Sequence, residues 1–164
     1  VSYIANAERP AFHPGRCADV TANGQVIGTL GEIHPLVAKN YDVTNRMYLA
    51  RLDFTALLAL EHTEITYKPL PKYPSVARDI AVVCDADLPV GELEACIAKS
   101  GKGLVKEIAL FDIYTGAPIP AGKKSVAFSL KLRSEDHTLT DAESDEDVKA
   151  ILAALEQEKG AVLR

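Results

Sequence analysis

Asp112 and Tyr114 are two side chains whose types and spacing could bind a nucleobase. Because they are two residues apart in a segment with a strand pattern, they share one face of that strand. An aromatic ring can stack on a base, and a carboxylate beside it can accept a hydrogen bond from the base edge. The alternative is an ordinary pair at the end of an edge strand, and these two residues alone leave both interpretations open.

Four basic side chains follow, in a segment from residue 123 to residue 133 that contains no acid: Lys123, Lys124, Lys131 and Arg133. Lys and Arg are the side chains that meet nucleic-acid phosphates, although a solvated strand edge would also carry them. Residues 135–147 hold seven acids and no Lys or Arg, so the formal net charge of −5 conceals an uneven distribution. We expect the acidic segment to face solvent or a partner subunit, away from RNA.

The sequence shows no pattern for catalysis or for a metal. His13 and Cys17 are four residues apart, but the glycine between them argues against a regular helix, and the three cysteines form no CxxC pair. The segments HPGR at 13–16 and EIHP at 32–35 contain His and Glu among turn-forming residues, without a nucleophile at a recognisable spacing. We therefore predict no catalytic residue, no metal site and, without a glycine-rich phosphate loop, no cofactor in this chain.

The composition is that of an ordinary soluble globular protein, since 48% of the 164 residues are apolar and 25% are charged. No apolar run approaches the ~18 residues that a membrane span needs, and no secretory signal pattern begins the chain. The scattered cysteines favour a reducing setting, so we expect a cytoplasmic location and no membrane partner. The missing initiating methionine is compatible with a piece of a longer chain.

A proline-rich segment divides the chain in two. Its prolines, at positions 69, 71 and 74, fix their own φ and hold the preceding residues extended, which excludes a helix. We predict two domains, residues 1–66 and 77–164, joined by a semi-rigid linker over 67–76. Arg78 and Asp79 open the strand after this linker, and we expect this adjacent pair to form a local salt bridge.

Strand and helix patterns alternate regularly after the linker. Their order is βαββαβ, the split βαβ or ferredoxin-like motif of the α+β class. An RRM-like antiparallel sheet of four strands would carry two helices on one face and leave the other open. The expected elements are a strand over 79–84, a helix from Asp87–Pro89 to Gly101, a strand over 105–114, a loop over 116–122, a strand over 124–132, a helix from the Thr140–Glu143 capping box to Gly160, and a strand over 161–163.

The strand over 124–132 predicts what lines each face of this sheet. Four apolar side chains would face the core: Val126, Phe128, Leu130 and Leu132. The alternate residues would line the open face: Ser125, Ala127, Ser129 and Lys131. Several readers of single-stranded RNA use such a face, but a merely solvated face is the commoner case, and the fold alone does not decide.

The first sixty residues read as a partial antiparallel α+β segment. Asn23-Gly24 predicts a hairpin turn, with a strand on either side. A short helix beginning at His34-Pro35, a strand over 47–53 and a helical end over 54–60 would follow. Such a set leaves sheet edges bare, so we expect it to be only part of a finished domain.

Six motifs in order give the chain a family resemblance. They are HPGR at 13–16, VIGTLGEIHP at 26–35, LPKYPSVARDIAVV at 70–83, LFDIYTG at 110–116, GKKSVAFSLKLRS at 122–134 and TLTDAE at 138–143. Together they resemble the carboxyl-terminal end of the beta subunit of bacterial phenylalanyl-tRNA synthetase. Cys17 departs from the serine expected after HPGR, but the site is expected to be structural, so this puts little in doubt.

The resemblance implies a fold and a set of partners. The first part would be the tail of a class II synthetase-like domain that does not catalyse aminoacylation, and the second a ferredoxin-fold anticodon-binding domain. The expected partners are the anticodon arm of tRNA(Phe) and the alpha subunit of an alpha2-beta2 heterotetramer. The alpha subunit would carry the active site with ATP, Mg²⁺ and phenylalanine, so this fragment would have no catalytic residues of its own.

The resemblance also assigns roles to particular residues. It associates Ala81, Asp112, Tyr114 and Ser125 with holding the first anticodon base, and the four bases of residues 123–133 would meet phosphates. Two other functions remain open from the residues alone. The chain could be a structural module for beta-subunit assembly, or a ferredoxin-like domain that senses a small ligand, neither of which would touch RNA.

Overall fold

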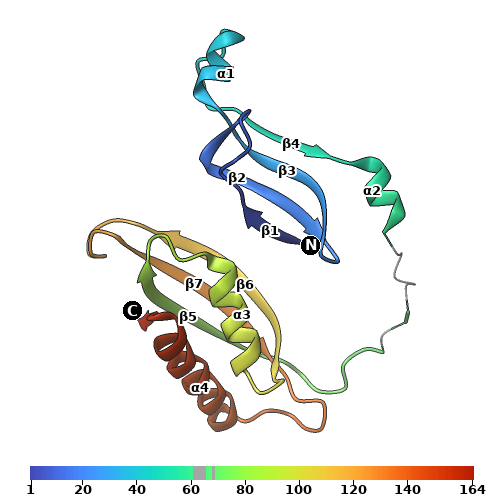
Figure 1. Ribbon diagram of the computed structural model, residues 1–164. Helices are drawn as coiled ribbons and strands as arrows, with labels where there is room; N and C mark the ends of the chain where they lie inside the picture. The colour runs from blue at the N-terminus through green and yellow to red at the C-terminus, as the bar shows by residue number, and fades with distance from the viewer. Residues whose placement is uncertain (61–65, 68) are drawn as a thin grey trace. The chain divides into compact units, whose positions relative to one another are not determined.

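The computed structural model describes residues 1–60, 66–67 and 69–164 (Figure 1). Residues 61–65 and 68, the end of the expected first domain and part of the expected linker, lie outside the described residues. The chain divides into two compact units, Val1–Tyr67 and Lys68–Arg164. Each unit has its own antiparallel sheet, and each is described by itself below.

The second unit has the expected βαββαβ order. Its strands pair antiparallel in the spatial order β6-β7-β5-β8, and α3 and α4 pack together on one face of this sheet (Figure 1). This confirms the ferredoxin-like α+β fold. The elements are β5 (Val76–Asp85), α3 (Val90–Ser100), β6 (Val105–Tyr114), β7 (Lys123–Leu132), α4 (Asp141–Lys159) and β8 (Val162–Leu163).

The core of the second unit lies between its sheet and its two helices. β7 confirms the predicted alternation, since Val126, Phe128, Leu130 and Leu132 are fully buried, whereas Ser129 and Lys131 between them keep exposed surface. Cross-strand partners on β5 and one side of each helix complete this layer: Ile80, Val82, Cys84, Leu93, Ile97, Ile151 and Leu155. Burial of these side chains, at roughly 25 cal/mol per Å² of apolar surface, is the main stabilising contribution to this unit.

The ends of α4 follow the capping signals in the sequence. The Thr140 hydroxyl accepts a hydrogen bond from the Glu143 N–H at 3.3 Å, and Glu143 Oε2 accepts one from the Thr140 N–H at 2.9 Å. The pKa of Glu143 is lowered to about 2, mainly by the hydrogen bond from the Thr140 backbone N–H and further by hydrogen bonds with the Thr140 hydroxyl and His137. Gly160 ends the helix in the left-handed conformation, at φ 61°.

Arg78 corrects one expectation. It forms no ion pair with Asp79, because neighbouring residues of a strand point to opposite faces and Arg78 lies on the helix side. Its guanidinium instead contacts Asp141 at 2.7 Å and Asp145 at 3.2 Å, both on the first turns of α4. The acidic start of α4 is therefore tied to β5 by a base 63 residues earlier.

The first unit is a four-stranded antiparallel sheet in the order β1-β2-β3-β4. Asn23 and Gly24 have φ of 49° and 80°, the left-handed pair of a two-residue hairpin, as predicted. Among the described residues its core is small, a buried cluster of Val20, Ala22 and Ile27. The elements are β1 (Ser2–Ala5), which the sequence did not predict, β2 (Phe12–Ala22), β3 (Gln25–Ile33), α1 (Pro35–Asn40), β4 (Tyr48–Leu52) and α2 (Phe54–Ala59).

Candidate nucleic-acid interface

The open face of the second sheet brings the four candidate base-contacting residues together. In the strand register, Asp112 on β6 lies opposite Ala127 on β7, and Ala127 lies opposite Ala81 on β5. One row further along, Tyr114 lies opposite Ser125. Residues directly opposite one another share a face, so all four candidates lie on the face away from α3 and α4.

A β-bulge places Asp112 and Tyr114 on this face. Ile108 and Leu110 lie opposite the buried residues of β7, on the helix side, and simple alternation would put residues 112 and 114 there as well. The register shifts between Leu110 and Asp112, so Phe111 is an extra residue without a partner on β7. Such a bulge re-aims the side chains that follow it. The spacing in the sequence correctly predicted a shared face but could not show which face.

Tyr114 is held against the loop that follows β6. Its Oη donates a hydrogen bond to the Ala117 carbonyl at 2.8 Å, and its side chain keeps 40% of its surface exposed. A Cβ at Gly116 would lie only 3.0 Å from Tyr114 Oη and 3.2 Å from its Cζ, so a side chain there would push the ring aside by a few tenths of an ångström. The Arg164 guanidinium lies 5.9 Å from the ring centroid. The ring is thus oriented before any ligand arrives.

Asp112 offers an acceptor that the described part of the chain does not use. The residue is exposed, and no hydrogen bond or ion pair of its carboxylate is formed with the described residues. Beside it the floor of the face is made of small side chains, since Ala127 is buried and Ala81 half-buried. Ser125 has only 3% of its surface exposed, between the larger Tyr114 and Val83 on the neighbouring strands. An acceptor, a ring and a shallow floor lie side by side.

Two of the four predicted phosphate contacts lie on this face, and both are already paired. Lys123 Nζ lies 2.6 Å from Asp85 Oδ1, which raises the pKa of the lysine. Lys131 Nζ lies 2.7 Å from Glu107 Oε2, and this hydrogen bond lowers the pKa of the glutamate. Each is a cross-strand pair in the sheet register. A phosphate would therefore compete with a carboxylate at both positions.

The other two predicted bases, Lys124 and Arg133, have different surroundings. Lys124 falls on the helix side of β7, where its Nζ donates to the Leu88 carbonyl at 2.6 Å. Arg133 follows β7, is half-buried, and its backbone N–H donates to the Leu104 carbonyl at 2.9 Å. The structure thus places Lys124 on the side opposite Tyr114, and the phosphate contacts of all four bases stay predictions.

Two further residues at this face were missed in the sequence. The Arg164 N–H donates to the Ala81 carbonyl at 2.9 Å, so the pairing of β8 with β5 continues one residue beyond Leu163. Val162 lies opposite Val83, which is on the open face. Because residues two apart in a strand share a face, alternation would have predicted that Arg164 lies on the open face as well. Phe111, at the bulge, exposes 61% of its surface, and no signal in the sequence marks it as an insertion.

The residues set aside as scaffold have structural partners. Arg16 donates to Glu32 at 2.7 Å, tying β2 to β3, and this hydrogen bond lowers the pKa of Glu32. All three cysteines are buried and free, and burial raises the pKa of each thiol. Within the described ranges, no three His, Cys, Asp or Glu side chains gather as ligands for a metal ion. No described helix is both long and apolar enough to span a membrane.

Comparisons with known proteins cover both units. The model of the ferredoxin-fold anticodon binding domain matches residues 71–164, and that of the phenylalanyl tRNA synthetase beta chain CLM domain matches residues 1–54. The phenylalanine–tRNA ligase beta subunit of Geobacillus kaustophilus is 46% identical over 158 residues, which is 96% of this chain and 20% of that protein. The beta subunit of Clostridium acetobutylicum is 42% identical over 164 residues, 100% of this chain and 21% of that protein.

A third relative gives the same proportions. The phenylalanine–tRNA ligase beta subunit of Bacillus subtilis is 44% identical over 161 residues, which is 98% of this chain and 20% of that protein. The chain therefore spans about a fifth of the length of the curated relatives that it matches.

Proposed function

The chain belongs to the phenylalanine–tRNA ligase beta-subunit family, and from that premise we propose that the open face of its second unit holds the anticodon arm of tRNA(Phe). The observation that carries this proposal is the bulge at Phe111. It puts the Asp112 carboxylate, which pairs with none of the described residues, next to the pre-oriented ring of Tyr114 over a floor of small side chains. A solvated sheet face has no need of that arrangement.

The proposed contacts divide into stacking and base-edge recognition. The Tyr114 ring would stack on one anticodon base, a contact worth ~1–3 kcal/mol that every base can make. The Asp112 carboxylate would accept a hydrogen bond from that base's donors, which is what distinguishes one base from another. Ala81 and Ser125 would let the base lie close to the sheet, because larger side chains there would hold it away.

Phosphate contacts would contribute less than the number of bases suggests. Lys123 and Lys131 must give up their carboxylate partners to meet a phosphate. The net gain in binding free energy from each exchange is therefore smaller than that of a new ion pair. Arg164 lies on the same face beside Tyr114 and is a further base for the backbone of the arm. Lys124, on the helix side, would serve only RNA that extends beyond this face.

The role of this chain in the parent enzyme would be positioning. The alpha subunit of an alpha2-beta2 assembly would carry out aminoacylation with ATP and Mg²⁺ in the cytoplasm. Holding the anticodon arm would orient the acceptor end toward that active site. Base contacts would add selectivity for tRNA(Phe) to this orientation.

The test is direct binding of this chain to tRNA(Phe) and to a non-cognate tRNA at two salt concentrations, measured by fluorescence anisotropy. We expect tighter binding of tRNA(Phe) at both concentrations, because base-edge contacts do not depend on counterion release. Equal binding of the two tRNAs would refute base recognition, and no binding of either would favour a purely structural module. Saturable binding of an amino acid that tRNA cannot displace would favour the ligand-sensing alternative.

A further inference from the structure

A pocket of about 160 Å³ lies on the helix side of the second unit, away from the open face. Its walls come from the turn between α3 and β6, the segment that precedes α4, and α4 itself. Leu104 and Leu139 provide the apolar part of the lining, and Asp147 on α4 lies among its charged residues. We call this the Asp147 pocket.

Asp147 occupies a core position without a core side chain. The buried residues of α4 are spaced by three and four, at Ser144, Asp147, Ile151 and Leu155, which is the stripe that faces the sheet. Only 2% of Asp147 is exposed, and neither carboxylate oxygen has a hydrogen-bond partner among the described residues. Buried polar groups are almost always paired, so an orphaned carboxylate at a pocket indicates a bound partner.

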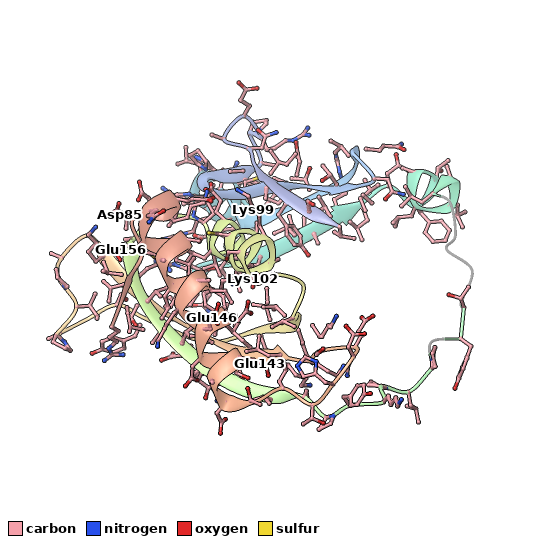
Figure 2. All side chains as sticks on the ribbon, turned by 90° about the horizontal axis from the view of Figure 1, so that it is seen from below. Asp85, Lys99, Lys102, Glu143, Glu146 and Glu156 are labelled. Atoms are coloured by element: carbon pink, nitrogen blue, oxygen red, sulfur yellow. The ribbon has the colours of Figure 1, made fainter. Side chains whose placement is uncertain are left out.

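The charges around the pocket favour a cation. Glu143 stays ionised at neutral pH, and among the described residues its carboxylate contacts His137 Nε2 at 2.9 Å and no Lys or Arg. Glu146 lies 3.4 Å from the Lys102 ammonium, a long contact between two exposed side chains. Figure 2 shows Glu143 and Glu146 along the same stretch of α4, with Lys102 nearby. Glu143 and Glu146 therefore line the pocket beside one lysine and one histidine, and burial raises the pKa of the unpaired Asp147 carboxyl, which a cation in contact with it would lower again.

We propose that the Asp147 pocket binds a small organic cation, a guanidinium or primary ammonium group, with Asp147 as its counter-charge. The volume of about 160 Å³ gives the pocket room for a group larger than a single water molecule. A planar guanidinium can donate two parallel hydrogen bonds to one carboxylate, so it would satisfy both orphaned oxygens once the Asp147 side chain turns from its buried position toward the pocket. Its carbon substituent would lie against Leu104 and Leu139.

Nuclear magnetic resonance of the whole ¹⁵N-labelled chain tests this site. Methylguanidinium chloride is titrated at constant ionic strength, and N-methylurea serves as the neutral molecule of the same shape. We expect saturable shifts of the Lys102, Leu104 and Leu139 amides with methylguanidinium only. At ten times the dissociation constant, the ratio of folded to unfolded protein should rise about 11-fold.

Asp147→Asn is the matched variant, because it keeps the shape and removes the charge. We expect at least a 10-fold loss of affinity for methylguanidinium in this variant. Asp147→Leu covers the case in which the amide variant does not fold, and it should melt above the natural chain and not bind. The same response in either folded variant, or an equal response to N-methylurea, would overturn the proposal.

Lys102→Gln distinguishes an external cation from an internal one. If the Lys102 ammonium turns to Asp147 in solution, methylguanidinium binds only after this substitution, and the proposal for the natural chain is wrong. A capped Gly-Arg-Gly peptide is compared with methylguanidinium to identify the source of the group. Tighter binding of the peptide indicates a protein side chain, and tighter binding of methylguanidinium indicates a free small molecule; both support a guanidinium site.

Discussion

Replacing Tyr114 in two ways separates the stacking surface from the loop that it holds. Tyr114→Phe keeps the ring and removes only the hydrogen bond from its Oη to the Ala117 carbonyl. Tyr114→Ala removes both. If the open face binds an anticodon base through the ring, the alanine variant should lose far more affinity for RNA than the phenylalanine variant.

The structure sets the expected size of each effect. The hydrogen bond joins partly exposed groups, so its loss should cost about 1 kcal/mol or less in stability and less than about 5-fold in affinity. Loss of stacking should cost ~1–3 kcal/mol, which is roughly 5- to 150-fold. Because Tyr114 lies on the open face with 40% of its surface exposed, neither change opens a cavity in the core.

The assay is fluorescence anisotropy with an anticodon stem-loop of tRNA(Phe), together with a thermal melt of each variant. Tyr41→Ala is the matched control, since Tyr41 is an exposed tyrosine of the first unit, with 78% of its surface accessible. It should leave binding unchanged. An alanine variant that stays folded and binds within 2-fold of the natural chain would refute stacking. Equal losses in the two Tyr114 variants would assign the effect to the loop.

Three further changes test other parts of the structure. Deleting Phe111 should straighten β6 and turn the two candidate side chains that follow toward the helices, abolishing stem-loop binding, whereas Phe111→Ser should keep the bulge and most of the affinity; equal affinities would refute the role of the bulge. Arg78→Gln should lower the free energy of unfolding, measured in urea, by less than about 1 kcal/mol, because both of its carboxylate partners are exposed; a loss above about 2 kcal/mol would contradict this. Glu143 has a folded-state pKa of about 2, below the ordinary 4.5, so its contribution to stability is present above pH 4.5 and lost as pH falls toward 2. Glu143→Gln should therefore reduce the dependence on pH of the free energy of unfolding, measured in urea, between pH 4.5 and 2. An unchanged pH dependence would contradict the lowered pKa of Glu143.

Features that depend on neighbouring residues were predictable from the sequence. The alternation of β7, the turn at Asn23-Gly24 and the capping box at Thr140 are each encoded within ten residues, and the structure has all three. The shared face of Asp112 and Tyr114 belongs to the same class, because it needs only a spacing of two.

Features that depend on distant pairing were not predictable. The bulge at Phe111 exists only in the register between β6 and β7, and the partners of Arg78 come from a helix that begins 63 residues later. The four residues of β1 have little strand pattern of their own. They form a strand because they pair with β2. For the same reason the sequence identified the basic residues of 123–133 but not the carboxylates that form ion pairs with Lys123 and Lys131.

Those occupied lysines have a consequence for the speed of encounter. The ammonium groups of Lys123 and Lys131 already form ion pairs with carboxylates, and the chain has a net charge of −5. This face therefore attracts a polyanion only weakly at long range. If this face binds RNA, its association rate constant should lie near the unsteered range of about 10⁵–10⁷ M⁻¹s⁻¹. Such a face works best as a second contact, where a tether elsewhere has already raised the local concentration of RNA and only the fit of one base remains to be decided.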